Sequence, residues 1–188
     1  MKKTLFSLAI AALFSIGATT TASAQAKTKT VMVGGAPMYP TKNIVENAVN
    51  SKDHTTLVAA LKAAGLVETL QSAGPFTVFA PTNEAFGKLP AGTVETLVKP
   101  ENKATLTKIL TYHVVAGRMT AADLTKAIKA GKGSATLKTV SGGTLTAMAK
   151  GKTIMLKDEK GGVSTVTIAD VLQSNGVIHV VNTVLMPK

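Results

Sequence analysis

The sequence contains no cysteine and no tryptophan, and only two tyrosines and five phenylalanines among its 188 residues. Without cysteine, the chain has no disulfide, no thiolate nucleophile and no cysteine-ligated metal. Its stability must therefore come from an aliphatic core. Hydrophobic residues make up 45% of the chain, which is typical of a globular rather than a disordered protein.

Acidic residues are also scarce, since ten Asp and Glu stand against 21 Lys and Arg. Two of the lysines, Lys2 and Lys3, fall in the N-terminal leader described next, which leaves 19 basic residues in the remaining chain. A basic surface attracts anionic partners such as lipid head groups, acidic polysaccharide or negatively charged protein. The charge by itself does not choose among these partners.

Residues 1–24 predict a cleavable secretory signal peptide. A short basic start is followed by an almost unbroken apolar run over residues 5–18, and Ala22-Ser23-Ala24 matches the small-x-small pattern of a cleavage site. We expect cleavage between Ala24 and Gln25. The apolar run is shorter than the roughly 20 residues of a spanning helix, and no later run is long enough. The product is expected to be secreted or periplasmic, with no integral membrane segment.

The rest of the chain predicts one domain. Residues 25–42 mix Thr, Lys, Gly and Pro without a period, and we interpret them as an irregular lead-in. Helical patterns then fill the first part of residues 43–188. Residues 43–46 have capping-box spacing, Asp53 is the expected N-cap of a second helix, and Gly65 is its expected C-terminal stop.

From Ser134 onward the apolar period changes from helical to two, which predicts short strands joined by Gly-containing turns. These strands are expected at 134–140, 144–149, 153–157, 163–168 and 177–181. Residues 169–173 are interpreted as one helical turn. Helices in the N-terminal half and hairpins in the C-terminal half predict an α+β fold.

Three motifs resemble those of the fasciclin domain. Residues 74–86 (GPFTVFAPTNEAF) resemble its first signature and residues 175–187 (NGVIHVVNTVLMP) its second, with Tyr112-His113 between them where that family has a Tyr-His motif. The resemblance extends over residues 43–188 and implies a fasciclin-like wedge-shaped β-sandwich with flanking helices, used outside cells for adhesion. Asn182 departs from the pattern, because the second signature commonly carries an acidic residue there.

The histidines of these motifs have two interpretations. A neutral imidazole in an apolar run most often satisfies a buried backbone group, which places His113 and His179 in the core. The alternative is that Tyr112 and His113 contribute to a binding surface, as the resemblance to animal adhesion proteins implies.

The sequence lacks the patterns of enzyme active sites. No serine lies in Gly-x-Ser-x-Gly, no two histidines have metal-ligand spacing, and residues 151–153 (Gly-Lys-Thr) lack the first glycine of a phosphate loop. The pair Asp158-Glu159 falls in a predicted hairpin turn and is interpreted as solvated. We therefore expect no catalytic residues, no cofactor and no metal.

The most basic stretch runs from Arg118 to Lys160 and contains no aromatic residue. It therefore lacks the stacking platform of single-stranded nucleic-acid sites, and export also argues against a nucleic-acid partner. The candidate contacts with an anionic surface are four lysines of the predicted hairpins: Lys138, Lys150, Lys152 and Lys157. The alternative is an ordinary solvated face.

These observations favour a secreted, non-enzymatic adhesion or protein-interaction module of the fasciclin type. Its expected partner is an extracellular protein or an anionic surface such as a polysaccharide, and the sequence does not indicate an oligomeric state. The alternative is a periplasmic or extracellular carrier of a small apolar ligand, which needs a cavity of roughly 300 Å³ or more. A hydrolase is a third hypothesis, for which no catalytic triad is found.

Overall fold

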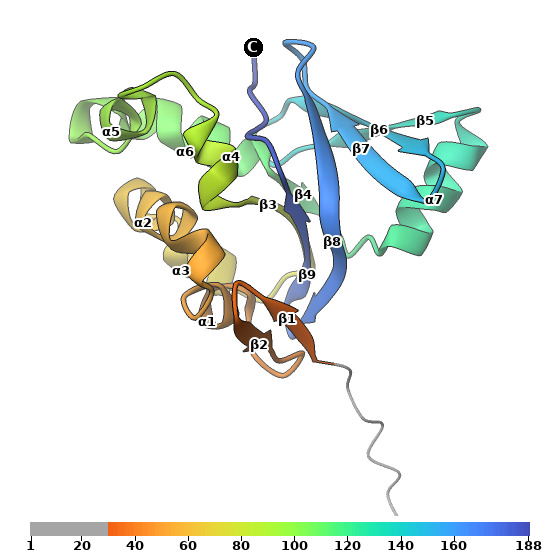
Figure 1. Ribbon diagram of the computed structural model, residues 1–188, viewed down its shortest axis with the longest axis horizontal. Helices are drawn as coiled ribbons and strands as arrows, with labels where there is room; N and C mark the ends of the chain where they lie inside the picture. Colours follow the sequence, from red (N-terminus) through yellow and green to blue (C-terminus); the bar gives the residue numbers. More distant parts are fainter. Residues whose placement is uncertain (1–29) are drawn as a thin grey trace, which may run out of the picture.

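The computed structural model describes residues 30–188 (Figure 1). The predicted signal peptide and the cleavage position between Ala24 and Gln25 lie outside the described residues. Within residues 30–188, no helix has the length and apolar character required to cross a membrane.

A seven-stranded sheet with the order β4-β3-β9-β8-β7-β6-β5 organises the fold. Its strands are β3 (Phe76–Pro81), β4 (Val114–Ala116), β5 (Ser134–Lys138), β6 (Thr144–Lys150), β7 (Thr153–Lys157), β8 (Val163–Gln173) and β9 (Gly176–Val181). Strands β3 and β9 are parallel, and the other neighbouring pairs are antiparallel. The two strands that carry the signature motifs therefore lie side by side as interior strands of the sheet.

The sheet folds back on itself at β8, which takes part in both of its halves. The register between β8 and β9 shifts between Val166 and Ile168 and again between Ile168 and Val171, and such bulges bend a strand and increase its twist. At the far side, the Val140 N–H donates to the Val114 carbonyl oxygen at 2.8 Å. The outermost strands thus approach each other, and the expected sandwich is confirmed.

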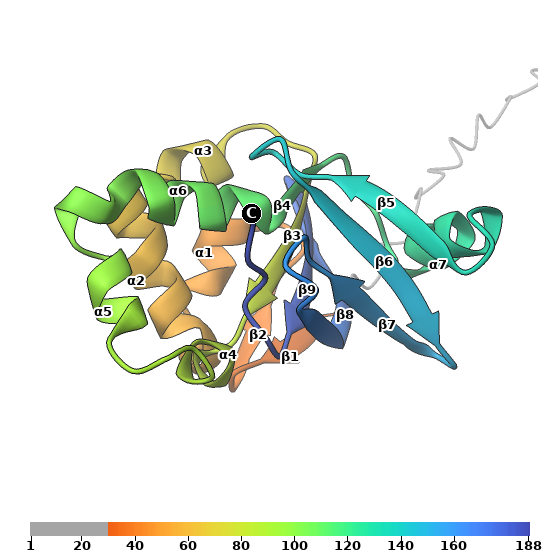
Figure 2. The same cartoon turned by 90° about the horizontal axis from the view of Figure 1, so that it is seen from above.

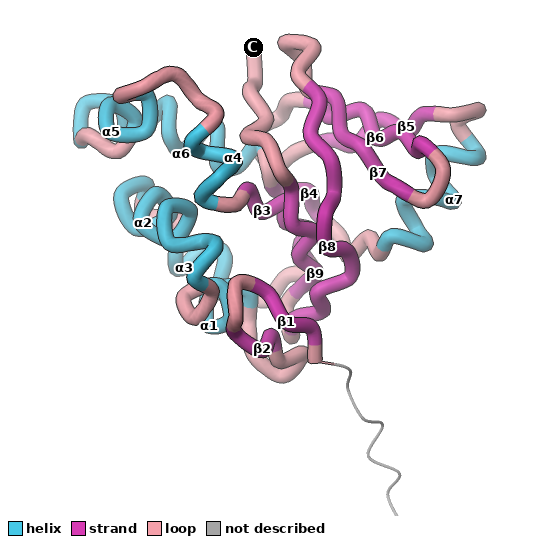
Figure 3. The backbone as a smooth tube through the Cα atoms, viewed as in Figure 1, coloured by secondary structure: helices cyan, strands magenta, loops and turns pink. Residues whose placement is uncertain are grey.

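All but the last of the helices in residues 30–188 gather on one side of this sheet, and the last lies beside the hairpin strands, as Figure 2 shows. The helices are α1 (Ile44–Ala48), α2 (Thr55–Ala64), α3 (Val67–Gln71), α4 (Asn83–Gly87), α5 (Thr93–Leu97), α6 (Lys103–Tyr112) and α7 (Ala121–Ala130), with 3-10 turns η1 (Lys52–His54) and η2 (Pro100–Asn102). Only α7 lies against the hairpin strands β5 and β6. The tube in Figure 3 shows α2, α5 and α6 apart from the hairpin strands β5, β6 and β7, and the predicted α+β class is confirmed.

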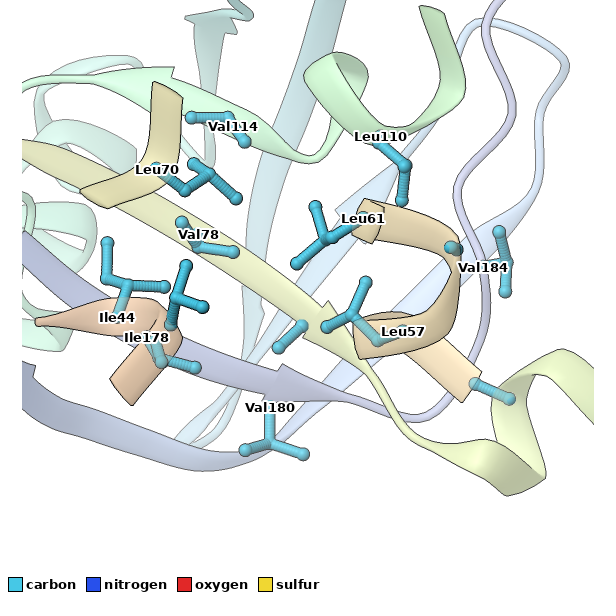
Figure 4. Packing of buried hydrophobic residues seen from close by; sticks show 14 of the residues in the cluster. Ile44, Leu57, Leu61, Leu70, Val78, Leu110, Val114, Ile178, Val180 and Val184 are labelled. Carbon is cyan, nitrogen blue, oxygen red and sulfur yellow. The ribbon is translucent and has the colours of Figure 1, made fainter. Parts of the chain in front are cut away.

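Two apolar cores lie on opposite sides of the central strands. The helix core contains Leu61, Val78 and Ile178 (Figure 4), and the sandwich core contains Phe79 and Leu145. Because side chains alternate along a strand, successive residues of β3 enter different cores. The nearly continuous apolar run of residues 76–80 predicts a strand buried on both faces, and the structure confirms this for residues 77–80.

The N-terminal lead-in is more ordered than its composition suggests. Strands β1 (Val31–Val33) and β2 (Ala36–Met38) form an antiparallel hairpin. Gly34 and Gly35 adopt φ values of 58° and 75°, as a two-residue hairpin turn requires. The predicted irregular structure over residues 25–42 is therefore wrong for residues 31–38. The Gly-Gly pair between two apolar segments was the available signal.

The sequence predicted some helix boundaries correctly and others incorrectly. The capping box between Asn43 and Glu46 is present, and Gly65 ends α2 in the left-handed region with φ 73°. Asp53 is not an N-cap, because it lies inside η1 and α2 begins at Thr55. The helical turn predicted at residues 169–173 is wrong, since pairing with β9 keeps this segment extended in β8 and tertiary context overrides local preference.

Candidate interaction surface

The hairpin strands β5, β6 and β7 present one face to the sandwich core and the other to solvent. The inward side chains Leu137, Leu145 and Leu156 are buried. The alternate positions carry polar or flexible side chains, so Lys138, Lys150 and Lys157 are exposed. A sheet with one solvated face has this alternation, and the predicted hairpins supply it here.

The strand register divides the candidate lysines between two ends of this outer face. Lys138 pairs with Thr144 and Lys157 pairs with Thr146 at one end, whereas Lys150 pairs with Thr153 at the other end. Thr146 and Lys150 are four residues apart on β6, which corresponds to about 13 Å along a strand. The four lysines therefore do not form one cluster.

The end with Lys150 consists of two neighbouring turns. Lys150 and Lys152 flank the turn between β6 and β7, and Lys129 and Lys132 lie where α7 leads into β5. The pairing of Ser134 with Met148 brings the start of β5 next to the end of β6. We call these four residues the lysine tip. No acidic residue occurs between positions 124 and 157, so the sequence around the tip contributes positive charge alone.

The second end, with Lys138 and Lys157, includes carboxylates. Glu159 accepts hydrogen bonds from the backbone N–H of Thr144 at 2.9 Å and of Lys188 at 3.2 Å. These bonds lower the pKa of Glu159, so the side chain stays negative and offsets the neighbouring lysines. Asp158 is buried, and the expectation that both acids are simply solvated is wrong for it.

Tyr112 and His113 lie inside the protein and do not contribute to this surface. The Tyr112 hydroxyl donates to the Thr144 carbonyl oxygen at 2.6 Å and accepts from the Glu159 N–H at 3.1 Å. His113 Nδ1 lies 2.9 Å from the Ile109 carbonyl oxygen. Tyr112 is 0% exposed and His113 3%, so their role in the structure is to join elements of the core.

The other two histidines are buried as well. His179 Nε2 lies 2.8 Å from the Met119 carbonyl oxygen and Nδ1 accepts the Asp170 N–H at 3.3 Å, while its ring stacks on Phe79. This confirms the predicted core position of His179. Burial lowers the pKa of His54 and of His179, so both favour the neutral form.

Asn182 accepts the local hydrogen bonds at its position through its side-chain amide oxygen. Its Oδ1 atom accepts hydrogen bonds from the Thr165 N–H at 2.9 Å and from the Thr183 hydroxyl at 3.2 Å. Both contacts need only an acceptor oxygen, which an amide and a carboxylate share. The departure from the family pattern therefore leaves this hydrogen bonding intact.

Two hollows of the described residues bear on the carrier hypothesis. An internal cavity of about 30 Å³ lies between the helices and the sheet, with His54, Leu57 and Ile178 in its lining, and ligand pockets are roughly ten times larger. A hollow of about 470 Å³ beside Pro75 and Arg118 is an open surface groove. Residues 30–188 also contain no group of three or more His, Asp or Glu side chains placed to hold a metal ion.

Comparison with known families gives a direct result. The fasciclin domain profile matches residues 52–187. The chain belongs to the fasciclin family. Its fasciclin domain thus includes both signature strands, the Tyr-His motif and the hairpins that carry the lysine tip.

Similar sequences come from several bacteria. Protein sll1483 of Synechocystis sp. is 46% identical over 178 residues, which are 93% of this chain and 91% of that protein. Cell surface glycolipoprotein MPB83 of Mycobacterium bovis is 36% identical over 148 residues, which are 74% of this chain and 58% of that protein.

A solved structure supports the fasciclin fold. The FAS1 domain pair of the insect cell adhesion molecule fasciclin I superposes with a TM-score of 0.68 at 19% sequence identity. The match covers 77% of this chain and 51% of the solved chain, so this protein spans about half of that domain pair. At this identity the similarity concerns the fold alone.

Proposed function

We propose that this protein is an exported, non-enzymatic adhesion module that contacts an anionic cell-surface partner through the lysine tip. The observation that carries the proposal is the arrangement of Lys129, Lys132, Lys150 and Lys152 in two neighbouring turns without an acidic residue in the surrounding sequence. Each side chain is exposed and free to follow an irregular partner surface.

The relatives support the setting of this proposal. One of them is named a cell surface glycolipoprotein, and the superposed structure belongs to an insect cell adhesion molecule. The predicted signal peptide over residues 1–24 agrees with such a location. The absence of a recognisable catalytic pattern in the sequence agrees with a binding role rather than an enzymatic one.

The physical basis of the contact is electrostatic attraction between exposed charges. A single lysine near an anionic membrane contributes about 1 kcal/mol, so useful affinity requires several lysines that act together. Exposed charges are screened beyond a Debye length of about 8 Å at physiological salt. Binding through the tip should therefore be strong at low salt and weak at high salt.

Paired lysine variants test the proposal. The mature chain, residues 25–188, is incubated with cell-surface fractions, acidic polysaccharide and anionic vesicles at low and high salt, and the bound fraction is measured. Lys150→Ala with Lys152→Ala should reduce low-salt binding at least several-fold. Lys138→Ala with Lys157→Ala should have a smaller effect, because Glu159 already offsets these charges.

The matched control removes two exposed lysines from the helical side, Lys62 and Lys99. This variant has the same net charge as the tip variant but keeps the tip intact, so it should bind like the parent protein. Equal losses in all three double variants would show that net charge alone governs binding. No binding at low salt by the parent protein would refute the electrostatic contact itself.

A further inference from the structure

The segment that follows β9, residues 182–188, crosses the boundary between the two cores. We call it the strap. Val184 is 5% exposed and belongs to the helix core (Figure 4), whereas Leu185 is 0% exposed and belongs to the sandwich core. The strap is neither helix nor strand, so no backbone ladder holds it beyond Asn182. Its attachment there combines the burial of Val184 and Leu185 with side-chain acceptors for its backbone N–H groups.

Three backbone N–H groups of the strap donate to side-chain acceptors. The Leu185 N–H donates to His113 Nε2 at 3.0 Å and the Met186 N–H donates to Asp158 Oδ2 at 2.9 Å. Glu159 accepts the third, from Lys188. Each acceptor is at full strength only when it carries no added proton.

The hydrogen bonds of His113 determine how protonation of its ring affects the bond to the strap. With Nδ1–H donated to the Ile109 carbonyl oxygen, Nε2 is the unprotonated nitrogen that accepts from Leu185. A proton on Nε2 would place two N–H groups against each other. Burial lowers the pKa of His113 from 6.5 to about 4, so the strap is held at neutral pH and this bond is lost in acid.

We propose that the strap is an acid-released latch, which detaches from the folded domain when His113, the acceptor of the Leu185 N–H, takes up a proton. The strands β3, β8 and β9 are held differently from the strap, because backbone N–H and carbonyl groups join them. These backbone groups do not titrate in the acidic range. Acid therefore opens the strap while the sheet is still paired. Its opening uncovers both cores at their boundary.

Other charged and ionisable groups also face the strap, and none of them opposes its opening before the sheet in acid. Lys88 Nζ donates to the Asn182 carbonyl oxygen at 2.6 Å and Lys108 Nζ donates to the Lys188 carbonyl oxygen at 2.7 Å. The Tyr112 hydroxyl accepts the Glu159 N–H, and burial raises its pKa. The charge of Asp158 raises the pKa of His113 and so favours its protonation.

The start of the strap should stay attached. The Asn182 N–H donates to the Thr165 carbonyl oxygen at 3.2 Å, and the Ser164 hydroxyl donates to the Thr183 carbonyl oxygen at 2.8 Å. These contacts involve neutral groups. The point of release is therefore expected after Thr183.

Amide hydrogen exchange, measured by NMR on the mature chain from pH 7 to pH 4, tests the latch. Protection factors are compared for Leu185 and Met186 in the strap and for Val78 and Val180 in the sheet. Uptake of one proton on opening changes the equilibrium by about tenfold per pH unit between the open and closed pKa values. The strap amides should lose protection at this rate below pH 6.5, ahead of the sheet amides.

Replacing the Asp158 carboxylate with a neutral amide should release the strap without acid. Asp158→Asn keeps one oxygen for the turn, where Oδ1 accepts the Lys160 and Gly162 N–H groups, and turns an NH₂ group toward the Met186 N–H. Protection of Leu185 and Met186 should fall at pH 7 by tenfold or more. Asp123→Asn, which removes an exposed carboxylate from the α7 cap, is the matched control and should leave the strap protected.

The latch would be refuted if the strap amides and the sheet amides exchanged together. If the strap amides lose protection together with the sheet amides at every pH, the strap opens only when the whole domain unfolds. The wild-type pH series decides this even if Asp158→Asn does not fold. Strap protection that does not depend on pH between 6.5 and 4 would equally refute the role of His113.

Discussion

The central strands and the hairpin strands of this domain differ in which faces they bury. β3 and β9 carry the signature motifs and are buried on both faces, whereas β5, β6 and β7 bury one face and expose lysines on the other. The residues that identify the family therefore hold the domain together. The proposed contacts lie at the end of α7, at the end of β6 and in the adjoining turns, outside both signatures, so the motifs that identify the family and the proposed contacts are different residues.

The largest expected effect tests the structural side of this comparison. Phe79→Ala empties the position of a fully buried ring that contacts His179, and such truncations cost about 3–5 kcal/mol. Denaturant unfolding should show a lower midpoint with an unchanged slope. Lys157→Ala on the hairpin face is the comparison, and a similar loss in both variants would refute the division between the two regions.

Acid should weaken the central region without a mutation. Because the pKa of His113 falls from 6.5 to about 4 on folding, its contribution to stability is fully present above pH 6.5 and is lost as pH falls toward 4. This difference corresponds to about 3 kcal/mol, and His54 and His179 act in the same direction. Free energies of unfolding measured across this range check the sign, and constant stability would contradict it.

A smaller effect is expected from Tyr112→Phe, which sharpens the assignment of the Tyr-His motif. The variant keeps the buried ring but removes the hydroxyl that joins Thr144 and Glu159. Leaving these groups unpaired costs about 1–3 kcal/mol. Unfolding should report this loss while low-salt binding stays unchanged in the folded protein. A loss of binding with unchanged stability would return Tyr112 to the list of contact residues.

The candidate site was only partly predictable. Lys150 and Lys152 were identified from the sequence because hairpin turns are exposed. Lys129 and Lys132 were not chosen, although the absence of Asp and Glu from residues 124–157 was a usable signal. Their proximity to the β6–β7 turn depends on strand register, which pairs Ser134 with Met148 and which sequence patterns indicate poorly.

The same limit applies to the strap. A sequence pattern showed that Asp158 and Glu159 follow a strand, but their bonds to Met186 and Lys188 join residues 28 and 29 positions apart. Nothing local in the sequence connects these positions. The pairing appears only once β7, β8 and β9 lie side by side.

The sequence by itself determined the α+β order, the capping boxes, the buried central strand and the family, since each depends on neighbouring residues or on motifs read in order. The tertiary structure alone decided that Tyr112 and His113 are internal, that the lysines form two ends rather than one patch, and that acidic groups hold the strap. The physical reason is that burial and charge pairing depend on distances between remote segments, which close only when the sheet folds back at β8.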